Sequence, residues 1–414
     1  MPEPVVRGVP AASRAPRRAR DAALLLAGIT ALAFNMRAAI TSLPPVFPEL
    51  AASLRLSPAA LSALAAVPVL CFGVFSGAAA PLSRWFGEER VLGAALVVLA
   101  AGLVLRGAFP GGMLFPGTAL AAFAIAVLNV LLPSLVKRRR PEQAGLLIGI
   151  YLVGLSAGSI LASLVAIPVY RLSGGSVPLT VGLWALPALG AALVWLPQLR
   201  YRTVPAARPA GAAGRLRVYR HALTWQVTLF MGLQSLTFYA ALSWVPTMFR
   251  DRGVSPGGAG NLLALMSFGG TITALVIPVL AHRARDQRAL IAATMVASAA
   301  GLAGVWFAPV GSAVAWILVL GLGQGAALGL AVFLMMARAP DPVAAASLSA
   351  FVQSVGYLLA TAGPLAVGFL HSATGGWTVP VTMLLVIMGL EFMAGWPAAR
   401  DVTLPLPGHA IAAD

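Results

Sequence analysis

Leu56-Ser57-Pro58 opens one long apolar run, and Val254-Ser255-Pro256 opens another 198 positions later. Three further pairs of hydrophilic breaks keep nearly the same offset: 84–90 with 283–288, 137–141 with 338–340, and 171–175 with 371–376. The chain therefore reads as two related halves. Parallel halves of six helices are typical of one large class of membrane transporters, in which the solute site lies between the halves near the bilayer midplane.

The composition places most of the chain in a bilayer. Of the 414 residues, 59% are apolar and 10% are charged, and the mean hydropathy is +0.90. Soluble proteins are about 45–50% apolar and about 25% charged. The single cysteine, Cys71, lies in an apolar run and excludes an intrachain disulfide. These values exclude a soluble enzyme, a disordered protein and a secreted disulfide-rich scaffold.

Apolar runs between charge and turn signals predict twelve spans. They cover 22–46, 58–82, 90–109, 112–135, 143–170, 177–198, 222–248, 259–281, 289–308, 312–337, 344–370 and 377–397. The predicted fold class is therefore all-α integral membrane, with twelve transmembrane helices in two pseudo-symmetric six-helix bundles. The expected domains are a cytoplasmic tail (1–21), an N-terminal bundle (22–199), a cytoplasmic linker (200–221), a C-terminal bundle (222–398) and a cytoplasmic tail (399–414).

The basic residues predict the orientation, because inner loops of membrane proteins are enriched in Lys and Arg. With the N-terminus inside, 22 of the 28 Lys and Arg residues fall on inner tails and loops. Arg37 lies within a span, and five residues are assigned to outer loops: Arg55, Arg106, Arg171, Arg250 and Arg252. Both termini are thus expected in the cytoplasm, with the chain in the cytoplasmic membrane. The net charge of +16 is an orientation signal and does not indicate nucleic-acid binding.

Arg37 is the strongest candidate for a solute site. An arginine at the centre of a membrane helix costs about 2.5–3.5 kcal/mol on insertion scales, so it needs water, a partner or a ligand. Asn35 and Thr41 lie nearby and join it as candidate binding residues. A guanidinium offers a fork of N–H donors that suits small planar anions. The alternatives are an arginine that reaches to the outer interface or binds backbone carbonyls near Pro44 and Pro45.

Polar residues on other spans are weaker candidates for contact with solute. They are Asn129, Tyr151, Gln234, Tyr239, Gln324, Gln353 and Tyr357. Packing between helices explains such residues equally well, at well under ~2 kcal/mol each. Glu391 is the one clearly intramembrane carboxylate and a candidate proton carrier. Its alternative, which we favour from sequence, is an interfacial residue on a peripheral helix near the cytoplasmic end.

Motifs for catalysis or cofactor binding are missing from the sequence. Gly154-Leu-Ser-Ala-Gly158 fits a nucleophile elbow, but it lies in an apolar helix without the strand that such an elbow requires. No glycine-rich phosphate loop precedes Lys137, and the four histidines have no metal-ligand spacing. We therefore expect no enzyme, cofactor or metal. The glycine pairs 154/158, 145/149, 321/325 and 325/329 are predicted to pack helices closely.

With these residues assembled, the chain resembles the major facilitator superfamily and, within it, the cyanate and nitroimidazole transporter (CynX/NimT) family. The resemblance is carried by Asn35-Met-Arg-Ala-Ala-Ile-Thr41 and by the stretches 67–73, 132–138, 232–239 and 285–288. It implies the major facilitator fold and secondary transport. Arg84, Gly87 and Arg90 match the superfamily's gating loop between helices two and three. Ser83, Glu88 and Glu89 depart from that motif, which weakens a charge-based gate there.

Three functions remain open from sequence. The leading hypothesis is secondary transport of a small anion, cyanate-like or a carboxylate, by alternating access and with possible proton coupling. The second is efflux of nitroimidazole-like or other small aromatic compounds, for which Phe34, Phe72, Tyr239 and Trp244 are suited. The third, a membrane enzyme or scaffold, lacks any supporting motif. The expected partners are the solute and the lipid bilayer, without nucleic acid, and the expected state is a monomer.

Overall fold

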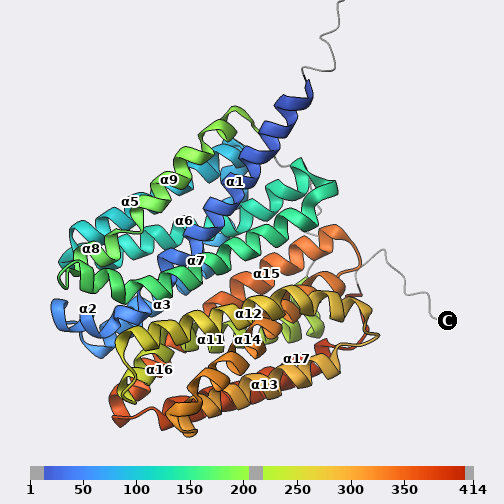
Figure 1. Ribbon diagram of the computed structural model, residues 1–414. Helices are drawn as coiled ribbons and strands as arrows, with labels where there is room; N and C mark the ends of the chain where they lie inside the picture. The colour runs from blue at the N-terminus through green and yellow to red at the C-terminus, as the bar shows by residue number, and fades with distance from the viewer. Residues whose placement is uncertain (1–13, 205–217, 406–414) are drawn as a thin grey trace, which may run out of the picture.

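Two helical bundles make up the molecule, as the computed structural model shows for residues 14–204 and 218–405 (Figure 1). The N-terminal half contains α1 (Arg14–Thr41), α2 (Phe47–Leu54), α3 (Pro58–Phe75), α4 (Ala79–Phe86), α5 (Glu88–Ala108), α6 (Pro110–Arg139), α7 (Ala144–Leu172), α8 (Val177–Gly182) and α9 (Ala185–Trp195). The C-terminal half contains α11 (Ala222–Asp251), α12 (Pro256–Arg283), α13 (Arg288–Phe307), α14 (Ala313–Ala337), α15 (Pro342–Ala360), α16 (Ala362–Thr374) and α17 (Thr378–Ala398).

The twelve predicted spans are confirmed as helical, and several consist of two consecutive helices, such as α15 with α16. Eleven of them are long and apolar enough to cross a membrane. The exception is α11, which carries many polar side chains along its length. The first helix begins at Arg14, earlier than predicted. Residues 1–13, 205–217 and 406–414 of the predicted tails and linker lie outside the described residues.

The motif that repeats after 198 positions has a local physical reason. The Ser57 hydroxyl accepts a hydrogen bond from the Ala60 amide, and the Ser255 hydroxyl accepts one from the Gly258 amide. In both places proline occupies the first helical position, where its missing N–H costs nothing. The serine and the proline together start the second membrane span of each half.

The halves also repeat at the end of the molecule where α1 begins, which we call the linker end. Arg139, at the end of α6, donates a 2.9 Å hydrogen bond to Gln198 on the chain that leaves α9. Arg338, after α14, donates to the side chain of Gln287 and, over 2.8 Å, to the Ala398 carbonyl at the end of α17. In each half an arginine after the fourth span thus fixes the chain that leaves the sixth.

The two halves contact each other from the middle of the molecule to the end opposite the linker end. We call that opposite end the far end. α7 and α12 run side by side there (Figure 1). Ser159 and Ser267 share a 2.9 Å hydrogen bond, and Thr271 donates one of 2.6 Å to Ser156. At the far end itself, a 2.7 Å ion pair joins Arg250 of α11 to a residue of α2, Glu49. The far end is closed in this structure.

Close packing uses some of the predicted glycines. A Cβ on Gly325 would come within 1.9 Å of the Gly270 carbonyl oxygen, and one on Gly158 within 2.0 Å of the Phe34 carbonyl oxygen. The prediction was wrong for 145/149, because a Cβ at either position would meet nothing within 4 Å. Glycine spacing alone does not reveal which face of a helix meets a neighbour.

Candidate functional site

Arg37 lies between the two halves. It is partly exposed on α1, and its guanidinium carbon lies 5.4 Å from the ring centroid of Phe238 on α11. Such a contact stabilises a cation by about 0.5–2 kcal/mol, more where water is excluded. Among the described residues, no carboxylate lies within 4 Å of it. Its positive charge is therefore turned toward the opposite half and has no anionic partner there.

Tyrosine side chains from three other helices lie near this guanidinium. Tyr239 of α11 lies beside Arg37, and Tyr151 of α7 and Tyr357 of α15 are close enough to interact with its charge. The Tyr151 hydroxyl donates a 3.0 Å hydrogen bond to Asn129 of α6. The structure thus brings together five of the residues that the sequence singled out, from five different helices of both halves.

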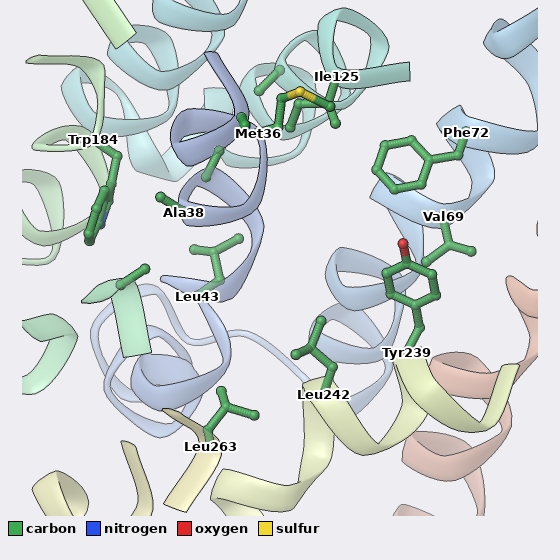
Figure 2. Close-up of a cluster of buried hydrophobic side chains, with 14 of the residues drawn as sticks. Met36, Ala38, Leu43, Val69, Phe72, Ile125, Trp184, Tyr239, Leu242 and Leu263 are labelled. Atoms are coloured by element: carbon green, nitrogen blue, oxygen red, sulfur yellow. The ribbon is translucent and has the colours of Figure 1, made fainter. Parts of the chain in front are cut away.

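Aromatic rings complete the cluster. Phe72 of α3 lies 6.3 Å from Tyr239 and 5.7 Å from Tyr357, measured between ring centroids, and the two tyrosines lie 6.4 Å apart. Figure 2 shows Phe72 facing Tyr239, whose hydroxyl points from α11 toward α3. These spacings and the inclined planes are favourable for aromatic contact. We call Arg37, Phe72, Tyr151, Tyr239, Tyr357 and Phe238, with Asn129, the central cluster.

Five of the predicted binding residues lie outside the central cluster, and three of them make contacts elsewhere in the fold. Asn35 donates a 3.1 Å hydrogen bond to the Pro187 carbonyl and so ties α1 to α9. Thr41 is buried and donates to the carbonyl of Arg37 over 2.9 Å. Gln353 donates to Ser349 of its own helix over 2.8 Å.

Gln234 and Gln324 form a second, buried polar group inside the C-terminal half. Gln234 of α11 donates to the Gln324 backbone carbonyl of α14, and the Gln324 side chain donates to the Thr237 hydroxyl, both over 3.4 Å. Glu391 of α17 lies beside Thr237. We expected an interfacial Glu391, which was wrong: the residue is 1% exposed, because α17 packs against α11 and α13.

In the predicted gating loop, the polar side-chain contacts are made by the residues that depart from the superfamily motif. Arg84 and Arg90 are exposed, and Gly87 supplies the φ of 87° that turns α4 into α5. Glu88 and Glu89, the departures from the motif, are fully buried. Glu88 accepts a 2.8 Å hydrogen bond from Ser134, and Glu89 accepts two from Thr203, of 2.6 and 2.7 Å. These bonds hold the start of the linker within the N-terminal half.

The position of Arg106 corrects the count of basic residues in the predicted outer loops. We assigned it to an outer loop, but it lies in the last turn of α5 and is 1% exposed. Its guanidinium donates to the carbonyls of Ala39 and Val181, over 3.0 and 2.9 Å. These carbonyls belong to α1 and α8, so Arg106 holds three helices together at the far end. Four arginines remain in the predicted outer loops.

The comparison with known families agrees with this architecture. The family model of the Major Facilitator Superfamily matches residues 24–364. The chain belongs to the major facilitator superfamily. Members of this family are transporters, as are the relatives named below.

The relatives lie in the subgroup that the sequence motifs indicated. The chain is 38% identical to the uncharacterized transporter YycB of Bacillus subtilis, over 91% of this chain and 94% of that protein. It is 35% identical to the 2-nitroimidazole transporter of Escherichia coli, over 91% and 96%. It is 28% identical to the cyanate transport protein CynX of Escherichia coli, over 85% and 91%. The resemblance to the cyanate and nitroimidazole transporters is confirmed.

Solved structures show the same fold at low sequence identity. A bacterial homologue of the human lysosomal transporter Spinster matches with a TM-score of 0.72 and 17% identity, over 93% of this chain and 98% of that one.

Proposed function

We propose that this protein is a secondary active transporter for a small planar anion, such as cyanate or an aromatic carboxylate. The central cluster is the solute site. Arg37 binds the negative group through its N–H fork, the rings of Phe72, Tyr239 and Tyr357 contact the flat face or edge, and Tyr151 with Asn129 adds hydrogen-bonding groups. The protein acts as a monomer in the cytoplasmic membrane.

One observation carries this proposal: a guanidinium at the junction of the halves without a carboxylate among its described neighbours. A charge held in a bilayer without a partner is costly and marks a functional site. A bound anion would supply the missing partner. The names of two relatives, a cyanate transport protein and a 2-nitroimidazole transporter, indicate small planar solutes as well.

Alternating access follows from how the halves meet. We place the linker end and both termini in the cytoplasm, on the distribution of Lys and Arg. The closed far end then faces outward. Opening the far end separates Glu49 from Arg250 and breaks the Ser159–Ser267 contact, while the rigid halves rock about the central cluster.

Uptake into proteoliposomes tests the proposal. Radiolabelled cyanate, benzoate and 2-nitroimidazole are offered to the wild type, to Arg37→Ala and to the matched control Arg220→Ala, whose arginine is exposed. We expect uptake of at least one anion by the wild type and the control, and its loss in Arg37→Ala. Anion uptake that persists in Arg37→Ala contradicts the site.

Efflux of uncharged nitroimidazole-like compounds is the second candidate function. The aromatic contacts of Phe72, Tyr239 and Tyr357 favour it, because ring stacking needs no charge on the solute. Cells that express the protein would then resist 2-nitroimidazole, and vesicles would take up no anion. The same uptake assay therefore separates the two candidates.

A further inference from the structure

Glu391 is an acid enclosed in the C-terminal half. Its residue is 1% exposed, and neither carboxyl oxygen has a hydrogen-bond partner among the described residues. No Lys, Arg or His lies within 4 Å of it there. An ionised carboxylate in such a place would have neither solvent, donor nor counter-charge, which is among the costliest arrangements in a protein.

The helices that pack around Glu391 carry no charged residue in their middle stretches. α17 packs against α11, α13 and α16. Apart from Tyr239, which faces Arg37, the charged or titratable residues of these three helices lie at their ends: Arg250 and Asp251 of α11, Arg288 of α13, and His371 of α16. A neutral, protonated carboxyl is therefore the form that this environment accepts.

The hydrogen bonds around Thr237 offer a place for that proton. The Thr237 hydroxyl lies beside Glu391 and donates its one hydrogen to the Gln234 carbonyl, over 3.0 Å. It accepts from the Gln324 side chain, so a single lone pair remains on its oxygen. Gln324 Oε1 is also buried without a donor. The group thus keeps free acceptors, and a protonated Glu391 can donate to the remaining lone pair of the Thr237 hydroxyl.

We propose that Glu391 is a proton-binding site that is coupled to solute transport. This inference rests on the proposed function. Thr237 directly precedes Phe238 and Tyr239, which face Arg37, so the same turn of α11 touches both the proton site and the central cluster. When α11 moves and water reaches Glu391, the carboxyl releases its proton. One proton then moves with each anion, and charge is conserved because Glu391 returns to its protonated form in every cycle.

Two measurements test this proposal. Infrared difference spectra of the purified protein at neutral pH compare the wild type with Glu391→Gln, which mimics the protonated shape. The carbonyl stretch of a protonated carboxyl is expected in the wild type and absent from the variant. In proteoliposomes, a pH gradient that is acid outside is expected to raise the initial rate of benzoate uptake severalfold above the rate in protein-free liposomes, where neutral benzoic acid crosses unaided.

Glu391→Gln is expected to keep benzoate counterflow, which needs no net proton movement, and to lose the stimulation of the initial uptake rate by the pH gradient. Glu142→Gln, at an exposed glutamate, is the matched control and is expected to behave as the wild type. Absence of the infrared band, or full stimulation of the initial uptake rate by the pH gradient in Glu391→Gln, overturns the proposal. If the wild type transports none of the probes, the proposed function fails, and the infrared band alone decides whether Glu391 holds a proton.

Discussion

The ion pair between Glu49 and Arg250 is the contact best placed to keep the far end closed. Its atoms lie 2.7 Å apart, and the side chains are 13% and 18% exposed. A hydrogen bond to a charged group contributes about 1.5–3 kcal/mol, and an exposed ion pair about 0–1 kcal/mol. For this partly buried pair we take about 1.5 kcal/mol, between those ranges.

Neutralising one partner should release the far end. Opening moves the two residues apart and lets water solvate both, so the loss falls on the closed conformation alone. About 1.5 kcal/mol corresponds to a roughly tenfold shift of the equilibrium toward the open form. Arg250→Gln should act slightly more strongly than Glu49→Gln, because Arg250 also donates to the Pro45 carbonyl.

Distances between spin labels report this shift. Arg171→Cys and Thr374→Cys place labels on exposed far-end positions of opposite halves, in a Cys71→Ala background. Both single neutralisations should populate a longer distance, and the double variant should add little, because each single change already breaks the pair. Unchanged distances in both variants, or fully additive effects, would refute the idea that this pair latches the far end.

Two predictions concern stability, measured as thermal unfolding of purified protein in detergent. Gly325→Leu should prevent stable folding, because even a Cβ would lie 1.9 Å from the Gly270 carbonyl oxygen. Gly149→Leu faces open space and should be tolerated. Equal stability of both variants would contradict the close packing at Gly325. Arg106→Ala should destabilise the protein by about 2–5 kcal/mol, because two buried carbonyls lose their donor. The exposed control Arg90→Ala should change stability by less than about 0.5 kcal/mol. A similarly mild effect of Arg106→Ala would show that its hydrogen bonds contribute little to stability.

The fold could be predicted because its signals are long and repeated. Each apolar run is as long as a bilayer is thick, and the serine–proline starts of α3 and α12 mark corresponding places in the two halves. Arg37 could be found because a charge in an apolar run is conspicuous. The exact ends of the helices, and the breaks within spans such as that between α15 and α16, could be located only in the structure, since hydropathy does not register short interruptions.

Which face of a helix contacts its neighbours was harder to predict than where the helix lies in the sequence. Asn35 is two residues from Arg37, so it points about 200° away around α1, toward α9. Glu391 lies on a helix whose apolar residues gave no sign of which side meets α11. Phe238 was missed because a phenylalanine in an apolar span looks like any lipid-facing residue. The Glu49–Arg250 pair spans 201 positions, and no local pattern in one sequence connects them.

Binding of a small anion to Arg37 is the central claim, and a thermal-shift titration of purified protein tests it most directly. Cyanate and benzoate are titrated against the wild type, Arg37→Ala and Arg90→Ala. A ligand at about 100 times its Kd stabilises the folded state by about 2.7 kcal/mol. We predict that at least one anion raises the unfolding temperature of the wild type and of Arg90→Ala and leaves Arg37→Ala unchanged. An equal rise in Arg37→Ala would contradict the account.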